Sequence, residues 1–316
     1  MRLFENTNID FLGIRKKFYL VSLGIIILGI VALFIKPIPF GIDFIGGTEL
    51  QLRIQEPVEV SDVRNIMEGS GMGSMEIKTM GSDRDILLRT PMQGEGQSVA
   101  EQIQNTIKNG IPGNNFEVLR VDKVGPKIGE ELRRNALLAI LFSLIGILIY
   151  LSLRFQFIYA LGAVIALLHD VLITVAAVAI FNAFLPLRLE FDQPMLAAFL
   201  TLIGFSVNDT VVIFDRIREN VRLFKHEDVE TVMNKSVNAT LSRTVITGGS
   251  VFLSVLVIFI FGGEVLRGFS FTFMIGILTG TYSSIFVASA VVVDWKHKFD
   301  KRKALGKEKR ASLSKL

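Results

Sequence analysis

The sequence predicts a polytopic α-helical membrane protein with six transmembrane helices and an α+β domain inserted between the first two. Half of the 316 residues are hydrophobic before glycine is counted, and the mean hydropathy is +0.49. Soluble domains hold about 45–50% apolar residues with glycine included. The apolar residues are gathered in six long blocks, and a mixed segment of 100 residues separates the first two blocks. With no cysteine, the chain has no disulfide scaffold and no thiol-based metal or catalytic site.

Each apolar block has at least 18 residues and at most one charged side chain. A helix of about 20 residues spans the roughly 30 Å of hydrocarbon in a bilayer. The helices of a large soluble core would need far more polar residues to cover them. The first block is longer than the apolar run of a signal peptide and lacks a small-residue cleavage site, so it is expected to be an anchor. The blocks are residues 18–35, 136–153, 157–184, 195–214, 244–263 and 268–293.

The distribution of Lys and Arg predicts that both termini face the cytoplasm. The N-terminus, the turn at Arg154, the loop 215–243 and the basic tail 294–316 together hold 20 of them, whereas the short loops on the other side hold two. Positive residues are enriched in short cytoplasmic segments. The tail is therefore expected to lie beside anionic lipid. A nucleic-acid patch is the less favoured interpretation.

Residues 36–135 are then expected outside the membrane as a periplasmic α+β domain. Apolar residues alternate at 50–54, 75–79, 86–88 and 116–121, as in half-buried strands. Helical spacing of apolar residues occurs at 60–67 and again at 99–107. The order β-α-β-β-α-β predicts a small ferredoxin-like domain. The membrane bundle resumes at 136 and continues to 293.

No catalytic motif is present. The sequence contains no HExxH, no GxSxG and no phosphate-binding GxxxxGK[ST]. Two of the three histidines lie in polar segments, so no histidine cluster is expected to hold zinc. An intramembrane serine protease would need a Ser–His pair, for which His169 and Ser206 are the obvious candidates. Neither a cofactor nor a metal is predicted, and any work must draw on an external energy source.

Asp209 is the polar residue that most strongly indicates a function. It lies in the fourth apolar block, about 9 Å from that block's end at Asp215. A buried charge at membrane depth is costly, so it needs a partner or a use. We expect Asp209 to load and release protons, with Asn208 beside it. Arg243, just before the fifth block, either pairs with Asp209 or marks the membrane edge. A fixed ion pair or a helix cap is the structural alternative.

Other residues are candidates of lower rank. His169 and Asp170 form a polar pair near the centre of the third block, where helix–helix hydrogen bonding is the alternative to a functional role. Asp43 precedes Gly46-Gly47 and is expected to cap a helix or line a mouth outside the membrane. Residues 124–132 suggest a hinge before the second helix. The loop 215–243 suggests two short amphipathic helices on the membrane surface. Small residues every four positions in the last block indicate close helix packing.

Five segments in order resemble the SecF family of the bacterial SecDF protein-export complex. They are FGIDFIGGTEL at 40–50, VGPKIGEELRRNA at 124–136, GFSVNDTVVIFDRIRENVR at 204–222, SVNATLSRTVITGG at 236–249 and FGGEVLRGFSFTFMIGILTGTYSS at 261–284. The resemblance covers nearly the whole chain. The GIDFIGG segment alone could equally suggest the partner family SecD. The stretch 246–250 departs from the family pattern, which is richer in Thr and Ser there.

The resemblance implies a half-transporter of the resistance-nodulation-division type in the bacterial inner membrane. It implies pairing with SecD, with the SecYEG channel and with YajC, and assistance to a translocating preprotein. It implies that the proton gradient supplies the energy. In the family, the acidic residue of the NDT motif and the arginine of the LSRT motif are functional, and these match Asp209 and Arg243. A small-molecule exporter of the same superfamily and an uncoupled membrane scaffold remain the alternatives.

Overall fold

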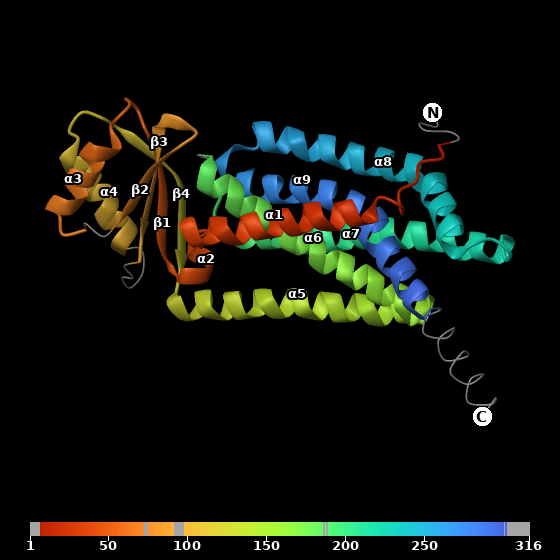
Figure 1. Cartoon of the computed structure of the whole chain (residues 1–316). Helices are drawn as coiled ribbons and strands as arrows, with labels where there is room; N and C mark the ends of the chain where they lie inside the picture. The colour runs from red at the N-terminus through yellow and green to blue at the C-terminus, as the bar shows by residue number, and fades with distance from the viewer. Residues whose placement is uncertain are drawn as a thin grey trace.

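The computed structural model describes residues 7–72, 75–91, 98–185, 187, 189–299 and 301. A bundle of long helices carries a small sheet domain at one end (Figure 1). Residues 7–14 and the end of the last helix lie at the opposite end of the bundle. Within these residues, six helices are long and apolar enough to cross a membrane. The predicted class, an α-helical membrane protein with an inserted α+β domain, is confirmed.

The six long helices follow the six apolar blocks, several with extensions. They are α1 (Arg15–Ile35), α5 (Pro126–Arg154), α6 (Phe157–Phe184), α7 (Gln193–Leu223), α8 (Val229–Phe261) and α9 (Gly263–Ser283). The last helix passes through a π-helical segment, η1 (Ser284–Ser289), and then continues as α-helix to residue 299. Helix α9 packs against α6, α7 and α8, and α1 packs against α6. Helix α5 lies along one side of the bundle and leaves most of its apolar surface exposed (Figure 1).

Two expectations from the sequence differ from the structure. The segment 124–132 does not form a separate hinge, because α5 begins at Pro126, a residue suited to the first turn of a helix. The loop 215–243 does not form two surface helices. Instead α7 and α8 continue through it and leave only residues 224–228 as the turn. Their apolar residues, such as Ile217 and Met233, are buried against Phe286 and the N-terminal residue Leu12 rather than against lipid.

Polar side chains fasten this end of the bundle. Arg15 at the start of α1 donates to Glu230 on α8 at 2.7 Å and to Asp294 on the last helix at 2.8 Å. Asn234 and Asn238 on α8 exchange hydrogen bonds with the backbone of Ile9 and Phe11. The N-terminal segment is therefore held on α8 by groups that α8 could not bury unpaired.

The sheet domain has the predicted order of elements. They are β1 (Gly47–Ile54), α3 (Val60–Gly69), β2 (Glu76–Met80), β3 (Ser82–Thr90), α4 (Ser98–Gly110) and β4 (Phe116–Val124), preceded by the short helix α2 (Ile42–Ile45). The four strands are antiparallel in the order β2-β3-β1-β4, which is compatible with the ferredoxin-like arrangement. Leu50, Leu52 and Ile54 alternate toward α3 and α4 and build the core of the domain. The opposite face of β1 and β3 carries charged residues and faces the bundle.

Close packing of the helices depends on small residues. A Cβ atom on Gly29 would lie 2.3 Å from the Cβ of Ala176, so α1 and α6 touch there backbone to backbone. Along α9, a Cβ on Gly276 or Gly280 would meet Leu202 or Ser206 of α7 at under 3.0 Å. The small-residue pattern of the last block therefore serves packing inside this chain, as predicted.

We expect Gly29→Ala to destabilise the bundle by about 1–3 kcal/mol, because the added methyl group overpacks the contact between α1 and α6. Gly24→Ala is the matched control on the same helix, since nothing lies within 4 Å of the Cβ that it would add. Thermal unfolding of the purified protein in detergent measures the difference. Equal midpoints for the two variants would contradict the close contact.

Candidate functional site

Asp209 is buried in α7 without a hydrogen-bond partner among the described residues. It is 3% exposed, and its Oδ2 atom has no donor. Helices α7 and α8 are neighbours, as the pairing of Asp209 with Arg243 requires. The structure nevertheless forms no ion pair between them within 4 Å. Arg243 is exposed on α8, close enough for its charge to act on the carboxyl group. The buried Oδ2 atom of Asp209 thus has no partner in the described part of the chain. Either a proton on the carboxyl group or the guanidinium of Arg243 would satisfy it.

Exposed polar residues flank this pair on α7 and α8, beside the exposed Val245 and Ile246. Thr201, Gly204 and Asn208 are exposed along α7, and Asp209 adjoins them on its buried side. On α8, the exposed Arg243 is followed by the exposed Gly249 and Ser250. Polar surface within membrane-spanning helices is rare against lipid and common against other protein or water.

His169 and Asp170 lie at the centre of a second, fully bonded polar network. Asp170 is 1% exposed, and its Oδ2 accepts from Ser206 Oγ at 2.6 Å and Ser283 Oγ at 2.8 Å. Its Oδ1 lies 3.1 Å from His169 Nδ1. His169 Nε2 lies 2.9 Å from both Ser22 Oγ and Tyr282 Oη, which are 3.1 Å apart. We call these six residues the His169 cluster.

The His169 cluster joins α1, α6, α7 and α9. Two adjacent residues project about 100° apart on a helix, so they do not normally face the same neighbour. In the structure the adjacent pair on α6 meets an adjacent pair on α9, Tyr282 and Ser283. Ser206 bonds to Asp170 and not to His169, so the Ser–His pair of a protease is not formed. Ser22 and Tyr282 were missed because a single hydroxyl in an apolar block gives no distinctive signal.

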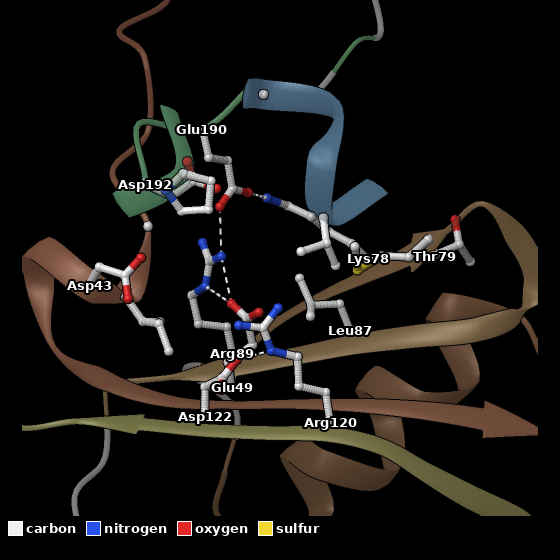
Figure 2. A pocket seen from close by; sticks show the side chains of 16 residues that line it. Asp43, Glu49, Lys78, Thr79, Leu87, Arg89, Arg120, Asp122, Glu190 and Asp192 are labelled. Carbon is white, nitrogen blue, oxygen red and sulfur yellow. Dashed lines mark hydrogen bonds and ion pairs between the residues drawn. The ribbon is translucent and has the colours of Figure 1, made fainter. Parts of the chain in front are cut away.

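The junction between the sheet domain and the bundle is built from charged residues (Figure 2). Arg89 on β3 contacts Glu190, in the segment between α6 and α7, at 2.6 Å and Glu49 on β1 at 2.7 Å. Lys78 on β2 reaches the other oxygen of Glu190 at 2.9 Å. These residues line a cavity of about 120 Å³ that also touches Asp43 and Asp192. Glu190 thus connects two strands of the sheet domain to the bundle.

Electrostatics at the junction favour the charged form of Glu190. Burial alone would raise the pKa of Glu190, but the charge and hydrogen bonds of Arg89, together with Lys78, hold it below the ordinary value. The pKa of Asp192 shifts in the opposite direction. Burial raises the pKa of Asp192 to about 6, the backbone N–H of Met195 opposes this, and Asp43 and Glu190 add to it.

Asp43 and Asp192 both cap the N-terminus of α7. Asp192 Oδ1 accepts from the N–H of Met195 at 2.8 Å, and Asp43 Oδ2 accepts from the N–H of Gln193 at 3.0 Å. Carboxylates are favoured at this end of the helix dipole. Asp43 thus caps α7 and lines the cavity at the junction.

The glycine pair that follows Asp43 is required by close approach. Gly46 and Gly47 have positive φ angles of 78° and 138°. A Cβ on Gly46 would lie 2.8 Å from Pro126 Cα, and one on Gly47 would lie 2.6 Å from Thr90 O. The pair lets the chain turn from α2 into β1 against the start of α5 and the end of β3. Among the described residues, no cluster of His, Asp and Glu could hold a metal ion.

We expect Glu190→Gln to loosen the sheet domain on the bundle, because Arg89 and Lys78 lose their shared charged partner. A hydrogen bond to a charged group contributes about 1.5–3 kcal/mol. The chain lacks cysteine, so spin labels can be placed uniquely at Arg64 of α3 and Leu253 of α8, both exposed. Pulsed electron spin resonance should show a broader distance distribution in the variant.

Asp85→Asn is the control for this experiment. It breaks the ion pair with Arg53 at 2.8 Å, which lies on the same sheet and does not reach the bundle. Distance distributions that coincide for Glu190→Gln and the unmodified chain would contradict the role of Glu190.

We expect Asp192→Asn to stabilise the protein at pH 8 by on the order of 1–3 kcal/mol. Asparagine caps a helix as well as aspartate does and carries no buried charge. The folded state holds the Asp192 proton more tightly than the unfolded state, since its pKa is raised from 3.8 to about 6. The stability that this proton contributes is therefore present below pH 4 and lost as the pH rises through 6. The advantage of the variant should shrink at pH 5.

Thermal unfolding at pH 5 and pH 8 measures this effect. The control is Asp62→Asn, in the exposed first turn of α3, which should show no such pH dependence. A benefit of Asp192→Asn that is as large at pH 5 as at pH 8 would count against the buried charge.

Comparison with known families agrees with this arrangement. The protein-export family SecD/SecF, C-terminal, matches residues 103–298, and the SecD/SecF GG motif matches residues 31–58. The protein translocase subunit SecF of Rhodothermus marinus is 45% identical over 96% of this chain and 99% of that protein. The SecF of Pseudomonas aeruginosa is 38% identical and covers 90% of each chain.

Solved structures give the same result. The crystal structure of SecDF from Thermus thermophilus, described as a translocon-associated membrane protein, has a TM-score of 0.80 and 36% identity over 92% of this chain. SecDF in a super-membrane-facing form has a TM-score of 0.68 and 35% identity over 96% of this chain. This chain spans about two fifths of those proteins, 39% and 41%. Asp43, Gly46 and Gly47 lie in the matched GG motif, and the buried residues Asp170 and Asp209 lie in the matched C-terminal region. The chain belongs to the SecF family of protein translocase subunits.

Proposed function

We propose that this subunit pairs with SecD in the bacterial inner membrane and couples the proton gradient to the export of proteins, with Asp209 as the group that takes and releases the proton. The observation that carries the proposal is the buried Asp209 oxygen without a donor. An ionised carboxylate in that position would be an uncompensated charge at membrane depth, which costs at least about 2.5–3.5 kcal/mol. The arrangement seen therefore suits the protonated form.

Arg243 supplies the second state. When Asp209 loses its proton, its charge attracts the guanidinium of Arg243, whose long side chain can reach inward along α8. An ion pair would then form where none exists in the structure described above. Asn208, the residue before Asp209, offers an exposed amide. Asp209 would thus alternate between a protonated state without an ion pair and an ionised state paired with Arg243. Coupling requires two such states, which the proton interconverts.

The exposed polar face around Arg243 supports pairing with SecD. This chain matches only two fifths of the SecDF chains, which leaves room for a second half of the transporter. A protein partner at Thr201, Asn208 and Arg243 would satisfy polar groups that lipid cannot. The SecYEG channel, YajC and the emerging preprotein are further partners that the family resemblance implies. The termini are proposed to face the cytoplasm and the sheet domain the periplasm, since the positive residues gather at the end opposite the sheet domain.

We expect Asp209→Asn to abolish the part of protein export that responds to the proton gradient, because an amide cannot exchange a proton. Export of a preprotein into inner-membrane vesicles, with SecD and the channel present, is measured with and without an uncoupler. Asp215→Asn is the control: it makes the same change two turns along α7 and breaks only the exposed pair with Arg154.

The control should keep its response to the uncoupler. Export by Asp209→Asn that still falls when the gradient is collapsed would rule out Asp209 as the coupling group. Normal export by Asp209→Asn, together with no response to the uncoupler in the unmodified chain, would favour a scaffold without ion coupling.

A further inference from the structure

The carboxyl group of Asp170 has three hydrogen-bond partners within the His169 cluster. Its Oδ2 accepts from Ser206 and Ser283, and its Oδ1 accepts from His169 Nδ1 in the tautomer that carries a proton there. A carboxylate that accepts from three donors is favoured in its ionised form. A negative charge that is 1% exposed within the bundle needs a positive charge nearby.

The described titratable groups around the cluster leave His169 as the source of that charge. The helices that form the cluster also carry Tyr19 on α1, Asp209 on α7 and Tyr282 on α9, none of which carries a positive charge, and Arg243 on α8 is exposed and acts on Asp209 instead. Arg15 lies two turns before Ser22 and is occupied by Glu230 and Asp294. Lys296 lies near the end of the last helix, where it contacts Tyr159. An imidazolium at His169 cancels the charge of Asp170, and its Nε2–H donates to Ser22 or Tyr282.

The cluster also accommodates the neutral imidazole without moving heavy atoms. When the proton on Nε2 leaves, Nε2 becomes an acceptor, and the hydroxyl of Tyr282 or Ser22 can rotate to donate to it. The Nδ1–H bond to Asp170 is kept in both states. Every polar group of the cluster is therefore satisfied whether His169 is charged or neutral.

We propose that His169 is a second proton-binding site of the subunit, held in its working tautomer by Asp170 and coupled to Asp209 through α7. The proposal rests on the proton coupling proposed above and adds a second group to it. Ser206, which bonds to Asp170, lies three residues before Asp209, so the two sites are one turn apart on the same helix. Binding of a proton by neutral His169 adds one positive charge near Asp209, which favours the ionised form of Asp209. The two sites then hold a proton alternately.

A π-helical segment of the last helix lies next to the cluster. Segment η1 begins at Ser284, directly after the two residues of α9 that bond to His169 and Asp170. Single π turns inside α-helices recur at functional sites because they interrupt the regular backbone ladder. A change in the hydrogen bonds of Tyr282 therefore acts on α9 at the point where its backbone ladder changes.

Histidine NMR of the whole chain in lipid nanodiscs tests the proposal directly. The chain has three histidines, so ¹⁵N-histidine labelling gives few signals, and His169→Gln identifies those of His169. We expect the His169 signals to move between the charged and neutral forms within pH 5–9. In Asp170→Asn the His169 titration midpoint should fall by at least about one pH unit, a tenfold loss of proton affinity. The midpoints of His226 and His297 should not move.

Thr174→Val is the matched control. It removes a contact between α6 and α9, Thr174 Oγ1 to Thr279 Oγ1 at 3.5 Å, one turn from the cluster and without a titratable group. It should leave the His169 midpoint unchanged, and in the export assay it should keep the response to the gradient that His169→Gln loses. A His169 that stays in one protonation state from pH 5 to 9, or a midpoint that Asp170→Asn leaves in place, overturns the proposal.

The test of His169 can fail or succeed independently of the test of Asp209. The NMR titration needs neither SecD nor a gradient, so it reports on His169 even where Asp209→Asn shows no loss of coupling. A His169 that titrates in the unmodified chain, with export unaffected by His169→Gln, would make the cluster a structural hydrogen-bond network and would also overturn the proposal.

Discussion

The need to satisfy polar groups within the chain governs the membrane bundle, because a bilayer offers them no partner. The His169 cluster meets this need completely: four helices contribute, and each hydroxyl, imidazole nitrogen and carboxylate oxygen has a partner. Asp209, one turn away on α7, does not meet it. The contrast separates a carboxyl group with a full set of partners, Asp170, from one whose Oδ2 has none among the described residues, Asp209.

Close backbone approach makes these contacts possible. The hydroxyl of Ser206 reaches Asp170 in a region where α9 passes α7 at Gly280, a position with no room for a side chain. At the other end, Gly46 and Gly47 bring the sheet domain against the start of α5. The two glycine-dependent contacts lie in different parts of the molecule, but both let two segments approach more closely than a side chain would allow.

Much of the fold could be predicted from the sequence, because each element has its own periodicity. The six apolar blocks and the order of strands and helices in the sheet domain need no long-range information. The junction could not be predicted, since Glu190 is one charge in a short polar stretch and its partners Arg89 and Lys78 are about 100 residues away. The hairpin of α7 and α8 was misjudged for a related reason: an amphipathic segment beside a membrane can bury its apolar face in lipid or in its own chain.

Of the candidate site, Asp209 and the pair His169 and Asp170 could be found from the rarity of charge in apolar blocks. Their partners Ser22, Ser206, Tyr282 and Ser283 could not, since hydroxyl side chains are common in membrane helices and often bond to their own backbone. Thr201 and Ser250 do so here. Only the packing of the helices shows which hydroxyl groups bond to another helix and which bond to their own backbone.

The double cap of α7 has a consequence for how the molecule can move. This helix is a rod of 31 residues, about 47 Å long. Asp43 holds its first turn, Ser206 and Asp209 lie on either side of its midpoint, and Asn220 near its far end bonds to Ser236 of α8 at 2.9 Å. A rod held at both ends transmits a tilt rather than absorbing it. A tilt of α7 at its capped end would therefore carry Ser206 and Asp209 with it.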